Sequence, residues 1–211
     1  NEYGPVMRQP NIRSLLNVRY LLTNVPPSES MALAETVSAP VTMVAGPARN
    51  ATGSMVYLYE FPEANPPAWV ASGAMKASDG DALATILDPR FNADMQRRVA
   101  LIDTGSTLSA ISDPSVVPPP SSITATVPRP QHGRILVDLS APAQDGNVLI
   151  VSENFYPGWE ATVDGRAVSP ERVDYVLIGV PLTAGATQVE LAFRSAPYET
   201  GKVITFAAVA I

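Results

Sequence analysis

The sequence has no cysteine, a single histidine and few charged residues, which make up 16% of the chain. The absence of cysteine excludes a disulfide framework, and a single histidine excludes His-rich metal sites. The formal net charge of -6 disfavours a nucleic-acid partner, because neutralising phosphates requires a basic patch. A glycine-rich phosphate loop is also absent. We therefore expect no cofactor, no metal and no bound nucleic acid.

Long apolar runs are missing as well. A membrane-spanning helix needs roughly 20 apolar residues, and the uncharged tail at 203–211 is much shorter. We expect this tail to be the start of a transmembrane helix, because it lacks the polar alternation of a half-buried strand. The alternative is a terminal strand that completes a soluble sheet. No signal-peptide pattern opens the chain, which indicates an excised piece of a longer protein.

Proline, in contrast, is abundant, with 21 residues, and segments with helical periodicity are few. We therefore expect strands and loops to outnumber helices in a mainly β protein. The segment SDPSVVPPPSS at 112–122 contains consecutive prolines, which exclude helix and favour extended backbone. We place a linker there, between an α+β region at 1–111 and a second domain at 123–202.

The α+β region should contain one amphipathic helix among short strands. Ser78 or Asp79 can cap this helix, and Asp88-Pro89 ends it. Its apolar face is expected to consist of Leu83, Ile86 and Leu87. Asn92 can cap a further helical turn. The strands of this region are predicted at 18–22, 41–44, 55–59, 68–71 and 99–102.

The second domain has the pattern of an antiparallel sheet, with short β-rich runs separated by turn sequences. The turn YPGW places Gly158 where positive φ is required, and Asp164-Gly165 suits a two-residue hairpin turn. We expect its strands at 123–127, 135–139, 148–151, 159–163, 166–168, 173–180 and 188–194. This pattern predicts an antiparallel β-sandwich of jelly-roll or immunoglobulin-like type.

Several blocks of this sequence resemble a known family. FYPGWEATVDGRAV, then DYVLIGVPLTAG, then VELAF are similar to the C-terminal extracytoplasmic part of the bacterial YfhO-type membrane proteins. LLNVRYLLT near the start and VYLYEFPEANPPAWV in the middle resemble two further blocks of that family, in the same order. The resemblance therefore covers most of the chain.

The resemblance implies a location and a function. YfhO-like proteins are similar to the GT-C glycosyltransferases, which use lipid-linked sugars and carry their catalytic acids in early loops at the membrane surface. The resemblance implies that the chain is a non-catalytic extracytoplasmic domain at the bacterial plasma membrane. It also implies that the parent protein is the glycosyltransferase. The domain would support sugar transfer to cell-envelope glycans by binding the acceptor or by scaffolding. Its partners would be an envelope glycan or lipid-linked sugar, and the membrane through the parent protein.

A glycan site needs flat rings for stacking and planar polar groups for sugar hydroxyls. The stretch around YPGW supplies both kinds of side chain. The candidate glycan-binding residues are Glu153, Asn154, Tyr156, Arg166 and Tyr175. Trp159 is predicted to be mainly buried, because it shares a strand face with Ala161 and Val163. The acidic pairs Glu153 with Glu160 and Asp164 with Asp174 are expected on the solvent face of the sandwich.

Two other functions remain as alternatives. Asp103-Thr104-Gly105 is similar to the active-site loop of aspartic proteases, which need two carboxylates that share a proton. One copy supplies half a site, so a protease would have to be a dimer. The other alternative is a free-standing secreted carbohydrate-binding module. His132, with Pro130 and Gly133 near it, is expected in a solvated turn rather than in a catalytic triad.

Overall fold

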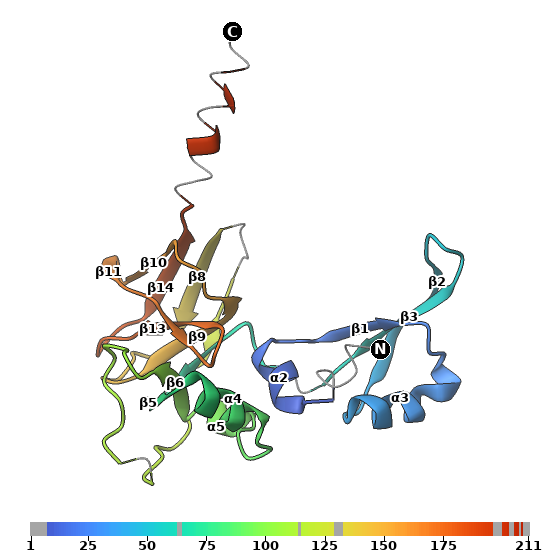
Figure 1. The fold of residues 1–211 in the computed structure, drawn as a ribbon, viewed down its shortest axis with the longest axis horizontal. Helices are drawn as coiled ribbons and strands as arrows, with labels where there is room; N and C mark the ends of the chain where they lie inside the picture. The colour runs from blue at the N-terminus through green and yellow to red at the C-terminus, as the bar shows by residue number, and fades with distance from the viewer. Residues whose placement is uncertain are drawn as a thin grey trace.

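A computed structural model describes residues 8–62, 65–113, 115–128, 133–195, 200–202, 205, 206 and 208. In this part of the chain three β-sheets and a few short helices form a body and an arm (Figure 1). Two of the sheets make the body, at the left of the figure, and the third makes the arm, at the right. The predicted mainly β fold is confirmed.

The larger sheet of the body has six strands in the order β4-β9-β13-β12-β6-β5. These strands are β4 (Ala68–Ala71), β9 (Val148–Asn154), β13 (Leu177–Pro181), β12 (Glu171–Val173), β6 (Val99–Asp103) and β5 (Gly73–Ala77). Neighbours are antiparallel, except for the parallel pair β5 and β6. Strands from both sides of residues 112–122 therefore pair within one sheet. The division into domains at this segment stays a prediction.

The second sheet of the body has five strands, all antiparallel, in the order β11-β10-β14-β8-β7. They are β11 (Arg166–Val168), β10 (Trp159–Val163), β14 (Gln188–Phe193), β8 (Arg134–Leu139) and β7 (Ala125–Thr126). The two sheets share one hydrophobic core. Its members include Val70, Leu149, Val151, Ile178 and Val180 from the larger sheet, and Val137, Ala161, Val163, Val189 and Leu191 from the smaller.

The alternation that the sequence shows in these strands is confirmed by burial. In β10 and β14 the predicted inward residues Ala161, Val163, Val189 and Leu191 are all buried. Val163 pairs with Arg166, so Asp164-Gly165 is the expected two-residue hairpin turn. The prediction of a jelly-roll or immunoglobulin-like type is not supported, because neither sheet has such a strand order. The strand order depends on long-range pairing, which local patterns do not specify.

A layer of short helices covers the outer face of the six-stranded sheet. It consists of α2 (Pro10–Leu15), α4 (Asp79–Leu87) and α5 (Ala93–Gln96). Ser78 caps α4 by accepting from the Asp81 N–H, and Asn92 caps α5, so both predicted caps are confirmed. The predicted apolar face of α4 was wrong in part. Ala82 and Ile86 face the sheet, whereas Leu83 and Leu87 are 40% and 41% exposed.

The run at 173–180, predicted as one strand, is a hairpin. Asp174 and Tyr175 have φ of 47° and 75°, so the chain reverses between β12 and β13. Asp174 is also wrongly predicted on the solvent face: it is 1% exposed, next to β6. Its backbone N–H and one carboxylate oxygen both bond to Leu101 of that strand. Pairing with β6, distant in the sequence, therefore buries a turn residue.

The arm, residues 18–62, is a three-stranded antiparallel sheet in the order β1-β3-β2. Its elements are β1 (Tyr20–Thr23), η1 (Pro27–Glu29), α3 (Ser30–Val37), β2 (Thr42–Arg49) and β3 (Met55–Glu60). One face of this sheet packs on α3 through Leu33, Val37 and Tyr59. Helix α3 was not predicted from the sequence.

The C-terminal tail is helical where it is described, at 200–202, 205, 206 and 208. The described residues of the tail lie away from the body (Figure 1). Within the described residues we find no helix with the length and hydropathy needed to cross a membrane.

Candidate functional site

A groove is lined by residues of both sheets of the body, near the end of β9, the start of β10 and the end of β14. It has a volume of about 570 Å³. It is lined by Pro67, Val127, Gly133, Ile135, Val151, Ser152, Glu153, Asn154, Tyr156, Trp159 and Phe193. We call it the end groove. It contains three of the five predicted glycan-binding residues, namely Glu153, Asn154 and Tyr156.

The YPGW turn shapes one wall of the end groove. Gly158 has φ of 117°, as predicted, and its carbonyl accepts from the Arg194 N–H at 2.8 Å. This bond continues the pairing of Trp159 with Phe193 at the ends of β10 and β14. The rings of Trp159 and Phe193 lie 5.3 Å apart at an interplanar angle of 58°. Because Gly158 has no Cβ atom, the chain can turn here and place the rings of Trp159 and Phe193 side by side on one surface.

A β-bulge positions the polar groups. Asn154 pairs with Leu177 and Val151 with Ile178, so Ser152 and Glu153 have no residue opposite them in β13. Bulges of this kind re-aim side chains at the ends of sheets. Tyr156 follows two residues later and is 58% exposed. A carboxylate, an amide and an open phenol ring therefore occupy one concave surface.

The end groove combines the two features of a sugar-binding site: aromatic faces for the apolar side of a sugar ring, and hydrogen-bonding groups for its hydroxyls. Trp159, predicted to be mainly buried, is half-buried and contacts both the core and the groove. Phe193 was missed as a groove residue, because its alternation with Val189 and Leu191 indicated the core. It is 40% exposed at the end of β14. We find no cluster of potential metal ligands among the described residues.

The other two predicted glycan-binding residues lie outside this groove. Arg166 pairs with Val163, four residues along β10 from Trp159, which places its backbone about 13 Å from that end of the strand. Tyr175 lies over the guanidinium of Arg172, at 5.9 Å, and is not part of the groove lining. His132 lies outside the described residues.

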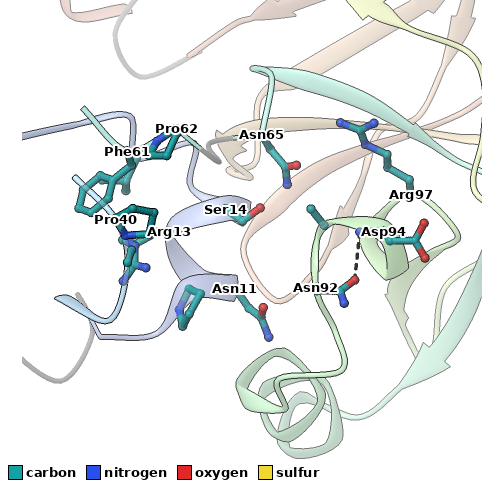
Figure 2. A pocket seen from close by; sticks show the side chains of 14 residues that line it. Asn11, Arg13, Ser14, Pro40, Phe61, Pro62, Asn65, Asn92, Asp94 and Arg97 are labelled. Atoms are coloured by element: carbon teal, nitrogen blue, oxygen red, sulfur yellow. Dashed lines mark hydrogen bonds between the residues drawn. The ribbon is translucent and has the colours of Figure 1, made fainter. Parts of the chain in front are cut away.

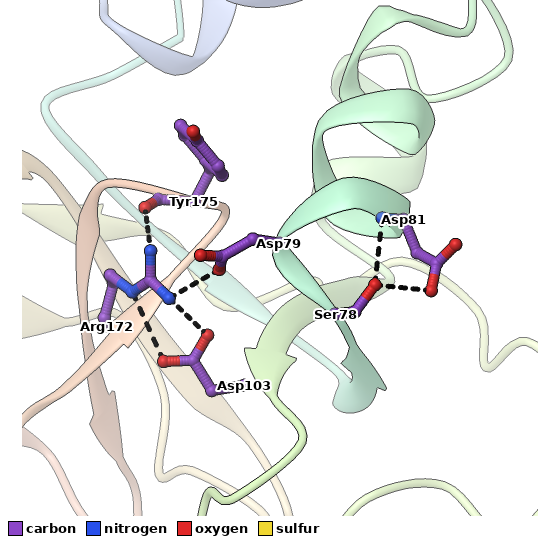
Figure 3. Close-up of polar contacts among 6 residues, drawn as sticks. All are labelled: Ser78, Asp79, Asp81, Asp103, Arg172 and Tyr175. Carbon is purple, nitrogen blue, oxygen red and sulfur yellow. Dashed lines mark hydrogen bonds and ion pairs between the residues drawn. The ribbon is translucent and has the colours of Figure 1, made fainter.

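Asp103, the candidate protease residue, belongs to a different cluster. Arg172 donates from Nε to Asp103 Oδ2 at 3.2 Å and from Nη2 to Oδ1 at 2.7 Å (Figure 3). The same Nη2 lies 2.6 Å from Asp79 Oδ1, and Nη1 donates to the Tyr175 carbonyl. The pKa of Arg172 is raised by its hydrogen bonds, most by the bond to Asp79 and next by the bonds to Asp103. A guanidinium, instead of a second carboxylate, therefore binds both oxygens of Asp103.

We expect no cleavage of an unfolded protein substrate at acid pH, because Asp103 has an arginine where a protease dyad needs a second acid. Asp103→Asn should change the free energy of unfolding by less than about 1 kcal/mol, since the pair with Arg172 is partly exposed. Gel assays of both proteins, and denaturation curves, measure these effects. Pepstatin-sensitive cleavage that disappears in Asp103→Asn would show that the protease hypothesis is right.

Comparison with known proteins gives one family match. Residues 129–205 match the family described as "Bacterial membrane protein YfhO". This confirms the predicted resemblance for the C-terminal blocks, in less than half of the chain. The two N-terminal blocks lie outside the matched residues. No curated protein matches the chain.

Two solved structures are also similar in part, both cryo-EM structures of the arabinofuranosyltransferase AftD from Mycobacteria. One is a mutant: its sequence is 25% identical, the match covers 40% of this chain and 7% of that chain, and the TM-score is 0.32. The other is 26% identical, the match covers 40% of this chain and 6% of that chain, and the TM-score is 0.30. This chain therefore spans less than a tenth of either structure's length. TM-scores this low do not establish a shared fold.

Proposed function

We propose that this chain is the non-catalytic extracytoplasmic domain of a larger bacterial membrane protein, and that its end groove binds a cell-envelope glycan. The family match over residues 129–205 supports the membrane setting. In the parent protein the uncharged tail at 203–211 would continue as a membrane-spanning segment. By holding an acceptor glycan near the membrane, the domain would assist sugar transfer from a lipid-linked donor.

The observation that carries this proposal is the composition of the end groove. Tyr156, Trp159 and Phe193 present rings to the same concavity as Glu153 and Asn154. Core packing alone would not account for Tyr156, which is 58% exposed. Aromatic side chains that remain open beside a carboxylate and an amide suit a ligand with one apolar face and several hydroxyls.

The chain has two tryptophans, and only one of them lines the groove. Trp69 is 2% exposed and packs on the opposite side of the larger sheet. A glycan in the groove should therefore change the fluorescence of Trp159 and leave that of Trp69 unchanged. Titration with soluble oligosaccharides of furanose and pyranose sugars, in wild type and in Trp159→Phe, provides the binding signal and its control.

Tyr156→Ala should weaken binding about tenfold, or about 1.4 kcal/mol, because it removes the most exposed stacking surface of the groove. Tyr20→Ala is the matched control, since Tyr20 is 51% exposed on β1 of the arm and lies outside the groove. Equal affinities of wild type and Tyr156→Ala would contradict the proposal. Arg166→Ala and Tyr175→Ala form a further comparison, and weakened binding in either would extend the site beyond the groove.

A free-standing secreted carbohydrate-binding module would have the same groove and give the same binding result. The membrane-protein hypothesis and the secreted-module hypothesis differ in the sequence that each expects before this chain in the parent protein. Several apolar spans encoded upstream of Asn1 would support the membrane protein, and a signal peptide placed directly before this chain would support the secreted module.

A further inference from the structure

A second cavity lies where the arm joins the body. Its volume is about 440 Å³. The arm provides Val18, Ala39, Pro40, Phe61 and Pro62; α2 provides Pro10, Asn11, Arg13 and Ser14; and the body provides Asn65, Asn92, Ala93, Asp94 and Arg97. We call it the junction pocket. Figure 2 shows side chains from these three segments around one space.

The junction pocket collects most of the buried polar side chains of the described residues. Seven polar or charged residues are buried in the described part of the chain, and four of them line this pocket: Asn11, Arg13, Ser14 and Asn65. A fifth, Gln96, accepts hydrogen bonds from Ser14 Oγ at 3.3 Å and Asn65 Nδ2 at 2.7 Å. Buried polar groups are more informative than buried apolar ones, because each has a desolvation cost. These bonds hold the pocket walls in place.

The charges of the pocket favour an anion, although the chain as a whole has a net charge of -6. Among the described residues that line the pocket, the only carboxylate belongs to Asp94, and it is paired with Arg98 at 2.7 Å. Arg13 donates to the Val37 carbonyl and packs on Phe61, and burial lowers its pKa. The guanidinium of Arg97 makes no hydrogen bond or ion pair with any described residue. Arg97 therefore leaves five N–H donors available to a ligand.

The apolar part of the lining includes three prolines and one packed aromatic ring. Pro10, Pro40 and Pro62 have fixed φ angles, and Phe61 is 4% exposed and packed against the arm helix. Small-molecule sites are usually formed in advance, with few polar groups on mainly apolar walls. The volume of the pocket lies within the range of roughly 300 to 1,000 Å³ typical of such sites.

We propose that the junction pocket binds a monosaccharide-sized ligand with one phosphate or carboxylate group, and that this group pairs with Arg97. The ring of the ligand packs on the proline-rich wall, while Asn65 and Asn92 contact its hydroxyls. The proposal is independent of the end groove, which is built from other residues. Because the walls come from both the arm and the body, a bound ligand also fixes the arm relative to the body.

Calorimetric titration with glucose 1-phosphate, glucuronate and neutral glucose tests the proposal. We expect one or both anions to bind with Kd on the order of 0.1 to 1 mM, glucose to bind at least tenfold more weakly, and affinity to fall with added salt. Arg97→Gln should lose the anion preference, and Arg97→Lys should keep part of it. Arg49→Gln, which removes the same charge from β2 outside the pocket, is the matched control and should bind like wild type.

Each result of these titrations either supports or overturns the proposal. Binding of only one anion identifies whether the site takes phosphate or carboxylate, and supports the proposal. Failure of both anions to bind wild type, equal binding of glucose, or unchanged anion binding in Arg97→Gln would each overturn it. Thermal unfolding of Arg97→Gln checks that the variant is folded. A change in end-groove binding is not expected, so the two sites can fail or succeed separately.

Discussion

Gly158→Ala should lower the free energy of unfolding by about 2 to 6 kcal/mol. A Cβ atom at Gly158 would lie 2.5 Å from the backbone carbonyl oxygen of Arg194 and 3.2 Å from the Phe193 ring. The φ of 117° adds strain of about 1 to 3 kcal/mol for a residue with a side chain. Relief of the clash requires movement of backbone, which costs about 1 to 3 kcal/mol more. Denaturant unfolding measures the loss.

Gly165→Ala is the matched control for this prediction. Gly165 also has a positive φ, of 78°, but nothing lies within 4 Å of the position that its Cβ would occupy. Gly165→Ala should lower the free energy of unfolding by only about 1 to 2 kcal/mol, the cost of a left-handed backbone at a residue with a side chain. Similar losses in the two variants would contradict the predicted clash at Gly158. Since Gly158 positions Trp159 beside Phe193, its substitution should also abolish the glycan binding that we propose for the end groove.

The stability of the protein should fall as the pH rises from about 4 to about 8, by up to about 4 kcal/mol, because of Asp174. Burial raises the pKa of Asp174 from 3.8 to about 7, and the bond from the Leu101 N–H only partly opposes this effect. Its Oδ2 has no hydrogen-bond partner among the described residues. The folded state thus binds a proton that the unfolded state releases near pH 3.8, and this contribution is lost as the pH passes 7.

Asp174→Asn should flatten this dependence. The amide oxygen can still accept from Leu101, and the side chain no longer becomes charged at high pH. The variant should gain stability relative to wild type above pH 7. Urea unfolding across this range measures both curves. Parallel curves would show that Asp174 does not titrate as described. The lowered pKa of Asp88, about 2 because of Arg90, acts in the opposite direction but at lower pH.

Much of the local structure was predictable, because its causes lie within a few residues. The Asp164-Gly165 turn depends on the left-handed conformations that these two residues adopt. The caps at Ser78 and Asn92 each use a side chain and an N–H two or three residues away. Three of the candidate glycan-binding residues, Glu153, Asn154 and Tyr156, line one groove because they lie within one short segment around a bulge and a turn.

The features that only the tertiary structure decided join residues that are distant in the sequence. Phe193 belongs to the end groove because β14 pairs with β10, which places it beside Trp159. Asp103 forms an ion pair with Arg172, 69 residues away, which the local sequence Asp103-Thr104-Gly105 does not indicate. Asp174 is buried because its turn packs on β6.

By itself, the sequence determined the mainly β character of the chain, its turns and caps, and the resemblance of residues 129–205 to the YfhO family. Only the tertiary structure decided the strand order, the separation of Tyr175 and Arg166 from the groove, and the junction pocket. The reason is physical: backbone preferences and side-chain alternation act over a few residues. Pairing between distant strands depends instead on how the whole chain buries its apolar surface and satisfies its backbone hydrogen bonds.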